Sequence, residues 1–405
     1  MNGFTKTLLV LVLFAAIVAS GGGLLAMQFL KTPASSSDET VIFEVKPGEA
    51  FKTVARRLEE QGLVSSAWKL EILARFTKNG SKVRVGEYAM RRDSKPREVL
   101  TTLNLGRSIE YSITVQEGFN RFEIADALAK SNLIKRDEFL ALTTDRALIR
   151  ELLNQEYASL EGYLFPETYH ITKFTGARGL IKMMVDRYKE NFAKAKAISG
   201  WNAVGLNDRQ LIILASIIEK ETGAPEERPV ISSVFHNRLR IKMPLQTDPT
   251  IIYGLWQETG AWNRNLSRAD LQAPNPYNSY LNLGLPPGPI SNPGFDAIKA
   301  AGAPATTEFL FFVSRNNGTH IFSKDYAQHQ RAVTQFQIDR KAREGKSWRD
   351  LKKREAVPEQ VIDSLPSAPK APPAAVAPAT KPPAPVSIKP PAPAPKANPS
   401  KGAQP

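Results

Sequence analysis

Residues 207–223 read Asn-Asp-Arg-Gln-Leu-Ile-Ile-Leu-Ala-Ser-Ile-Ile-Glu-Lys-Glu-Thr-Gly. Asn207 and Asp208 are of the types that cap a helix N-terminus, and Gly223 is of the type that follows a helix C-terminus. The residues between them are apolar on nearly every side of a helix, and not only along one stripe. The segment therefore predicts a buried helix, Asp208–Thr222.

Two carboxylates, Glu219 and Glu221, fall in the last turn of this helix. Glu219 lies on the same face as Ala215 and Ser216, whose small side chains leave space for a ligand. Loss of hydration and the negative end of the helix dipole both favour the protonated carboxyl form, which a general acid needs. The alternative is an ordinary pair of helix-end carboxylates that interact with basic neighbours, Lys220, Arg228 or Arg238.

The region after this helix is dense in side chains that can bind sugar hydroxyls. A helix is expected over Pro229–Arg240, then a polar loop over 243–250 and a stiff Pro/Gly loop over 284–294. Amide, hydroxyl and carboxylate groups form hydrogen bonds with hydroxyls, and tyrosine rings can stack on sugar rings. The alternative is that these residues only form turns and solvated surface. The candidate binding residues are Asn237, Gln246, Thr247, Asp248, Tyr277, Asn278 and Tyr280.

Composition narrows the classes of function. The net charge of +14 suits either an anionic partner or an ordinary basic surface. We expect no nucleic-acid partner, because no zinc-finger, RNP or basic-zipper pattern is present. The absence of cysteine excludes disulfides and thiol catalysis. The four histidines lack the spacing of a metalloprotease helix, so we expect no metal and no cofactor.

The N-terminus carries a long apolar segment. No charged residue lies between Lys6 and Lys31, and the 24 residues from Thr7 to Leu30 would span about 36 Å as a helix. A bilayer core is about 30 Å thick, so residues 1–31 predict a cytoplasmic stub and a transmembrane anchor. The alternative is a signal peptide cleaved near Ser20. In both cases the rest of the chain is exported.

An internal repeat follows a short linker over residues 32–40. Val45-Lys-Pro-Gly48 and Val115-Gln-Glu-Gly118 each precede a helical pattern, which stops at Gly62 in the first unit and at Asn132 in the second. Between the two units, residues 82–90 alternate as in a strand. These patterns predict a module of small α+β units over residues 41–146.

A larger, helix-rich domain is expected over residues 147–345, so the fold class is α+β. Helices are predicted at Arg178–Ala195 and Tyr326–Arg343, and a β-hairpin at Phe309–Val313 and Thr319–Phe322. Residues 346–405 begin with a charged segment and continue as a Pro/Ala-rich tail with spaced lysines. That tail lacks the apolar residues of a core and is predicted to be disordered.

Several long motifs, in the same order, resemble the endolytic murein transglycosylase (YceG-like) family. The resemblance covers about Val41 to Lys341 and leaves out the tail. The motifs are Glu161-Gly-Tyr-Leu-Phe-Pro-Glu-Thr-Tyr169, Leu214-Ala-Ser-Ile-Ile-Glu-Lys-Glu-Thr222, Asn237-Arg-Leu239, Leu245-Gln-Thr-Asp-Pro-Thr250, Tyr277-Asn-Ser-Tyr280 and Gly284-Leu-Pro-Pro-Gly-Pro-Ile-Ser-Asn-Pro-Gly294.

This resemblance implies a reaction and a layout. The reaction is cleavage within a peptidoglycan strand, between N-acetylmuramic acid and N-acetylglucosamine, as the muramoyl 6-hydroxyl attacks its own anomeric carbon to leave a 1,6-anhydro end. The implied acid/base is Glu219, with Glu221 as the second choice or as a residue that shapes the site. The implied layout is an inner-membrane anchor, a LysM-like module and a periplasmic catalytic domain, with peptidoglycan synthases as expected partners.

A single catalytic carboxylate agrees with this reaction. Hydrolytic glycosidases usually use two carboxylates, whereas a tethered internal nucleophile needs only one group that donates and then accepts a proton. The sequence is also compatible with two other functions. One is a hydrolytic muramidase with Asp248 or Glu221 as its second carboxylate, and the other is a non-catalytic wall-binding scaffold.

Overall fold

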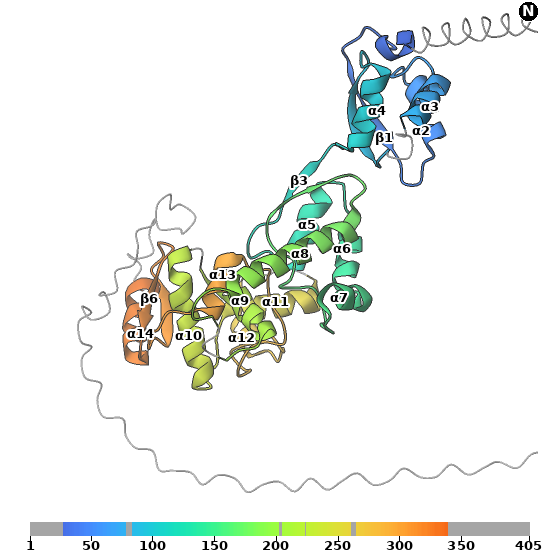
Figure 1. Ribbon diagram of the computed structural model, residues 1–405. Helices are drawn as coiled ribbons and strands as arrows, with labels where there is room; N and C mark the ends of the chain where they lie inside the picture. The colour runs from blue at the N-terminus through green and yellow to red at the C-terminus, as the bar shows by residue number, and fades with distance from the viewer. Residues whose placement is uncertain (1–26, 78–82, 202–204, 223, 261–264, 339–405) are drawn as a thin grey trace, which may run out of the picture. The chain divides into compact units, whose positions relative to one another are not determined.

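A computed structural model describes residues 27–77, 83–201, 205–222, 224–260 and 265–338. In these ranges the chain is a mixed α+β protein in which many helices accompany three antiparallel strand pairs (Figure 1). Most of the expected anchor, the position of Gly223 and the expected Pro/Ala-rich tail lie outside them. Within the described ranges, no helix combines the length and apolar character needed to cross a bilayer.

The first part of the described chain is a small module around one antiparallel strand pair. Its register places Phe43 opposite Tyr88, and both side chains are fully buried. Helix α2 covers this core with Val54, Ala55 and Leu58, the spacing of one helix face. Its elements are β1 (Thr40–Val45), α2 (Phe51–Glu60), α3 (Ala67–Phe76), β2 (Gly86–Arg91) and α4 (Pro96–Leu105).

The expected internal repeat is confirmed in backbone geometry. The turns before α2 and before α5 (Arg121–Lys130) contain Gly48 and Gly118, with φ of 73° and 76°. Gly62 and Asn132, the expected stops, also adopt positive φ, at 69° and 56°. Glycine and asparagine tolerate this left-handed conformation best, which explains why these residue types end both helices.

The middle part is built around the pairing of β3 (Tyr111–Thr114) with β4 (Thr168–Ile171). Its hydrophobic cluster includes residues from Ile113 to Val185 and therefore runs across the expected domain boundary at residue 146. The helices of this part are α5, α6 (Arg136–Thr143), α7 (Arg146–Leu153) and α8 (Gly176–Lys196).

Helix α8 connects this middle part to the last one. Its first half, with Leu180 and Met184, joins the middle cluster, whereas Tyr188 and Phe192 in its second half join the next cluster. The predicted helix Arg178–Ala195 is confirmed, with two further residues at its start and one at its end.

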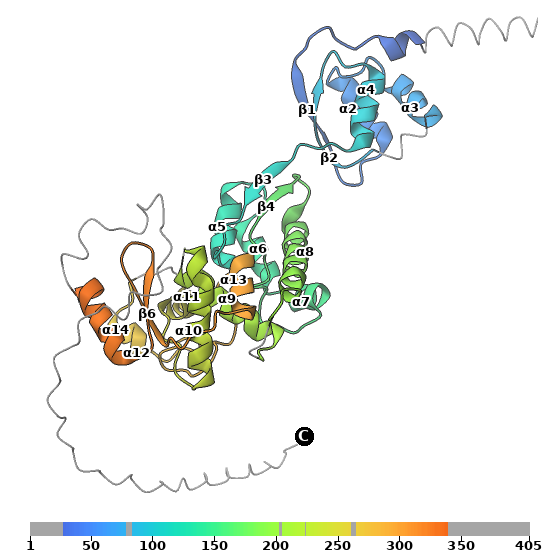
Figure 2. The same ribbon diagram turned by 60° about the vertical axis from the view of Figure 1, so that its left-hand side comes forward.

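Helix α9 (Asp208–Glu221) is the buried helix that the sequence predicted. Asn207 and Gln210 form a capping box at its start, and every residue from Leu211 to Glu219 is buried. Figure 2 shows α9 among the helices that contact it. These are α10 (Arg228–Arg240), α11 (Asp248–Thr259) and α13 (Phe295–Gly302), and the short helix α12 (Arg268–Gln272) follows α11 in sequence.

The C-terminal elements confirm the expected hairpin, β5 (Phe311–Ser314) and β6 (His320–Ser323). The helix predicted over 326–343 is present as α14 (Tyr326–Val333), which continues as a π-helical turn, Thr334–Ile338. The remainder of that prediction lies outside the described residues.

Two local expectations were wrong. Residues 248–250 are not loop but the start of α11, because Asp248 and Pro249 suit the first turn of a helix. The space expected above Ser216 is filled by the Pro/Gly loop. The Ile290 amide donates to Ser216 Oγ at 3.0 Å, and Ser291 Oγ donates to the Ser216 carbonyl at 3.0 Å.

Candidate active site

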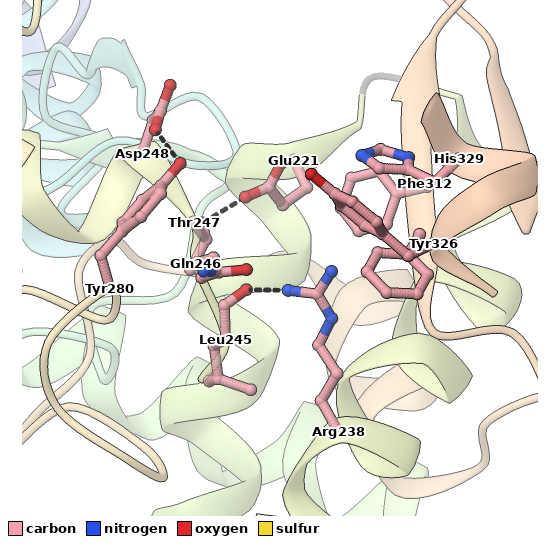
Figure 3. Close-up of a pocket in the computed structure, with 11 residues that line it drawn as sticks. Glu221, Arg238, Leu245, Gln246, Thr247, Asp248, Tyr280, Phe312, Tyr326 and His329 are labelled. Atoms are coloured by element: carbon pink, nitrogen blue, oxygen red, sulfur yellow. Dashed lines mark hydrogen bonds between the residues drawn. The ribbon is translucent and has the colours of Figure 1, made fainter. Parts of the chain in front are cut away.

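A cavity of about 390 Å³ opens where the end of α9 meets the start of α11 and the C-terminal hairpin. Figure 3 shows Asp248 and Tyr280 on one side of it, and Phe312, Tyr326 and His329 on the other. Its lining residues are Glu221, Arg238, Leu245, Gln246, Thr247, Asp248, Tyr280, Phe311, Phe312, Tyr326 and His329.

Glu221 is the last residue of α9, and its carboxyl group faces this cavity (Figure 3). Thr247 Oγ1 donates a hydrogen bond to it, and the Thr247 amide is itself held by Ser279 Oγ at 3.0 Å. Burial raises the pKa of Glu221, and the nearby Asp248 adds to the rise. The Thr247 hydrogen bond and the charges of His320 and Arg238 act in the opposite direction. The result favours a carboxyl that holds a proton next to an open cavity, as a general acid requires.

The polar wall of the cavity consists of Gln246, Thr247, Asp248 and Tyr280. The Tyr280 hydroxyl donates to Asp248 Oδ1 at 2.7 Å. Gln246 has a φ of 50°, and its backbone N–H donates to the Ser279 carbonyl at 3.1 Å. These contacts fix the Tyr280 hydroxyl and the Asp248 carboxylate along one side and hold the backbone that carries Gln246. Hydroxyl, amide and carboxylate groups suit the hydroxyls of a sugar. All four residues were predicted from the sequence as ligand-binding.

The aromatic wall consists of Phe311, Phe312, Tyr326 and His329, with Arg238 at its base. Arg238 lies 5.4 Å from the centroid of the Phe311 ring, and the rings of Phe311 and His329 stack at 5.1 Å. The sequence predicted the hairpin and helix that carry these rings but assigned none of the residues to a site. One available signal was the Asn237-Arg-Leu239 motif, which contains Arg238.

Glu219 is buried on another side of α9 and does not line the cavity. Its Oε1 accepts a hydrogen bond from Arg228 Nη2 at 2.9 Å, and its Oε2 accepts one from the Gly294 amide at 2.9 Å. A guanidinium and a backbone amide thus occupy one carboxylate oxygen each, and contacts of this kind are charge-assisted hydrogen bonds. The geometry therefore gives Glu219 the contacts of a buried ion pair that anchors the Pro/Gly loop to α9.

Three predicted binding residues lie away from the cavity. Asn237 donates to the carbonyls of Thr307 and Phe309 at 2.9 and 3.0 Å. Asn278 is fully buried and holds the backbone of its own loop, through two carbonyls and the Tyr280 amide. Tyr277 packs its ring against Tyr253, with centroids 5.2 Å apart. Each of them shapes the loops that carry the lining residues.

A second buried carboxylate, Glu161, fixes the position of the Pro/Gly loop. Its oxygens accept hydrogen bonds from the Arg121 amide, the Tyr253 hydroxyl at 2.9 Å and Asn292 Nδ2 at 2.8 Å. Asn292 Oδ1 in turn accepts from the amides of Gly162 and Leu164. Gly162 has a φ of 87°, and a Cβ there would lie 2.5 Å from Pro289, so only glycine fits this close approach.

Replacing Glu161 with glutamine is expected to destabilise the fold. The Arg121 amide, the Tyr253 hydroxyl and Asn292 Nδ2 all donate to its oxygens, so the new NH₂ group would face donors and leave at least one unsatisfied. We expect a loss of about 1–3 kcal/mol in the free energy of unfolding, measured by urea denaturation. Glu156→Gln, at a largely exposed side chain, is the matched control and should change stability by less than about 0.5 kcal/mol. Equal stability of the two variants would contradict this role for Glu161.

The fold and this cavity define a protein with a buried carboxyl group of raised pKa beside a cavity lined by hydroxyl, amide and aromatic groups. Residues 43–335 match the model of the YceG-like family, and the chain belongs to that family.

The chain is similar to two proteins named endolytic murein transglycosylase and to one solved structure of a yceG-like protein. The endolytic murein transglycosylase of Bacillus subtilis (strain 168) is 29% identical over 336 residues, which cover 79% of this chain and 91% of that protein. The endolytic murein transglycosylase of Streptococcus pneumoniae (serotype 2, strain D39) is 27% identical over 357 residues, and the match spans 63% of its length. A crystal structure of a putative yceG-like protein from Listeria monocytogenes is 28% identical, covers 73% of this chain and 99% of that one, and gives a TM-score of 0.48.

Proposed function

We propose that this chain is an endolytic lytic transglycosylase that cleaves the bond between N-acetylmuramic acid and N-acetylglucosamine within peptidoglycan strands. Family membership and the names of its relatives support the coarser statement, that it is a peptidoglycan transglycosylase and therefore a lyase. The single observation that carries the proposal is Glu221, a carboxyl with a raised pKa in a hydroxyl-lined cavity. We assign the acid/base role to Glu221 in preference to Glu219, because both Glu219 oxygens already bind protein donors.

In the proposed reaction Glu221 acts twice. It first donates its proton to the glycosidic oxygen as the bond from that oxygen to the muramoyl anomeric carbon breaks. The resulting carboxylate then accepts the proton of the muramoyl 6-hydroxyl, whose oxygen forms the new bond to the anomeric carbon. The products are a strand with a free 4-hydroxyl and a strand with a 1,6-anhydro end, and Glu221 is protonated again. The hydrogen bond from Thr247 holds the carboxyl in position between the two steps.

A second candidate function is hydrolytic muramidase activity, because Asp248 lines the same cavity as Glu221. Two carboxylates across a site can serve as acid and base for an attacking water. Digestion of purified peptidoglycan in water labelled with heavy oxygen separates the two reactions. A transglycosylase releases ends that are lighter by one water molecule and carry no label, whereas a muramidase releases labelled reducing ends. Binding without any new ends would favour a scaffold and reject both.

The pH dependence of cleavage should follow the protonation of Glu221. The pKa of this group is raised above its ordinary value, so the carboxyl stays protonated above the pH at which a free glutamate ionises. Activity should therefore be retained at weakly acidic pH and fall as pH rises through the raised pKa. The measurement is kcat/KM on soluble glycan strands against pH. Thr247→Val removes the hydrogen bond that lowers the pKa, so it should move the alkaline limb of the profile to higher pH. A limb that stays in place would contradict the role of this hydrogen bond.

The setting of the enzyme is part of the proposal. We propose a single inner-membrane anchor in residues 1–31, a LysM-like module that holds glycan and a catalytic domain in the periplasm. We further propose that the enzyme acts together with peptidoglycan synthases and terminates growing strands, as would fit an endolytic enzyme anchored near the site of synthesis. Protease treatment of spheroplasts should digest the body of the full chain, and protection of the body would reject this orientation.

A further inference from the structure

The two walls of the cavity differ in charge. The polar wall carries the carboxylate of Asp248, and the aromatic wall carries the guanidinium of Arg238. Among the described residues that line the cavity, Arg238 is the one permanent cation. A substrate that lies across Glu221 therefore meets opposite charges on its two sides, and this difference can fix the direction of the strand.

Arg238 is held rigidly, and one of its nitrogens remains available. Nε donates to the Leu310 carbonyl at 2.7 Å, and Nη1 donates to the Leu245 carbonyl at 2.8 Å. In the described part of the chain, Nη2 donates no hydrogen bond. Figure 3 shows this remaining nitrogen pointing into the cavity below Glu221 and Tyr326. A fixed guanidinium nitrogen of this kind binds carbonyl and carboxylate oxygens well.

His329 adds a second polar group on the same side. Its Nδ1 is buried and has no hydrogen-bond partner among the described residues, while its ring stacks on Phe311. Burial lowers the pKa of His329, and the charge of Arg238 lowers it further, so the imidazole is neutral at pH 7 and can donate or accept. The aromatic wall thus offers a cation, a neutral ring nitrogen and apolar ring faces.

The two sugars of the substrate differ in a matching way. N-acetylmuramic acid carries a lactyl group, with a methyl and a carboxyl carbonyl, where N-acetylglucosamine carries a hydroxyl. We propose that the aromatic wall is the subsite for N-acetylmuramic acid and that Arg238 Nη2 donates a hydrogen bond to its lactyl carbonyl or carboxylate oxygen. The lactyl methyl then contacts the rings of the wall, and the polar wall takes the hydroxyls of N-acetylglucosamine. This inference rests on the proposed function, since it assigns the substrate of that same site.

Binding of three oligosaccharides to the full chain carrying Glu221→Gln tests this subsite without any cleavage. The ligands are a tetrasaccharide of alternating sugars with free lactyl carboxylates, the same compound with methylamide-capped carboxyls, and chitotetraose, which has no lactyl group. Titration calorimetry should give a Kd for the free carboxylate at least about tenfold lower than for chitotetraose. The amide should lie between them, because its carbonyl still accepts but carries no charge. Equal affinity for all three, or tightest binding of chitotetraose, would overturn the subsite.

Variants on the two walls identify the residue that causes the preference for the lactyl carboxylate. Arg238→Gln should reduce the preference for the carboxylate to within about twofold, whereas Asp248→Asn on the opposite wall should leave it at about tenfold or more. If Arg238→Gln does not fold, His329→Phe keeps the stacking and removes the ring nitrogens, and it should lower the preference about threefold. An unchanged preference in a folded wall variant would overturn the assignment. A parent chain that discriminates these ligands but does not cleave peptidoglycan would reject the proposed function and leave the subsite standing.

Discussion

Glu221→Gln should abolish cleavage of glycan strands, with a fall in kcat/KM of about 10³-fold or more. Glutamine has nearly the same shape as protonated glutamic acid and keeps an oxygen for the Thr247 hydrogen bond. It has no proton to give to the glycosidic oxygen and cannot accept one from the 6-hydroxyl. The rate is measured by the appearance of anhydro ends from purified strands, per mole of folded protein.

The same substitution should leave the fold intact. Burial raises the pKa of the replaced carboxyl, and glutamine has nearly the shape of the protonated acid. We therefore expect the free energy of unfolding to stay within about 1 kcal/mol of the parent. Gln246→Ala, on the same cavity wall, is a suitable control and should retain measurable cleavage. Activity of Glu221→Gln within tenfold of the parent would contradict the assignment.

Glu219→Gln should have the opposite pattern, with a large effect on stability and a small one on chemistry. Arg228 is 6% exposed, and its Nε has no hydrogen-bond partner among the described residues. Loss of the Glu219 charge leaves this guanidinium buried, and within the described ranges its one remaining carboxylate partner is Glu117, at 3.7 Å. Breaking a buried pair from one side costs about 3–5 kcal/mol. Urea denaturation should show a loss of that order, and kcat per folded molecule should stay within about tenfold of the parent.

A second substitution separates charge from packing at this pair. Adding Arg228→Met to Glu219→Gln removes the uncompensated cation and should restore part of the lost stability. Asp186→Asn, in the exposed pair with Lys182, is the matched control for loss of an ordinary ion pair and should cost less than about 1 kcal/mol. If Glu219→Gln were as stable as the parent and without activity, Glu219 would be the acid and the present assignment would be wrong.

Much of the fold could be predicted because its signals are local. The capping residues of α9 predicted where this helix begins, and its continuous apolar character predicted that it is buried. The Asn-Asn-Gly turn predicted the β5–β6 hairpin. The repeat was recognisable because Gly48 and Gly118 occupy equivalent positive-φ turns. Each of these features depends on residues a few positions apart, which is the range over which sequence patterns report backbone conformation.

The choice between Glu219 and Glu221 could not be made in the same way. Two residues in a helix lie about 200° apart around its axis, so these two carboxylates face different sides of α9. A helix that is apolar all round gives no indication of which side meets the cavity. The resemblance to a family pointed to the motif, and within it Glu219 was the first choice and Glu221 the second. Only the positions of Gly294 against Glu219 and of Thr247 against Glu221 distinguish them.

The aromatic wall was missed for a related reason. Phe311 and His329 lie far along the chain from Glu221, and no local pattern brings them together. Arg238 was within a recognised motif, yet its neighbour Asn237 was the more obvious sugar ligand by residue type. The structure shows that Asn237 holds the segment around Thr307 and Phe309, whereas Arg238 lines the cavity.

The most direct test is the rate of anhydro-end formation by Glu221→Gln and Glu219→Gln, measured side by side on purified glycan strands and normalised to folded protein. We predict that Glu219→Gln is at least about 100-fold faster than Glu221→Gln, since only the latter lacks the acid/base. The reverse order would contradict the account, and so would equal rates close to that of the parent.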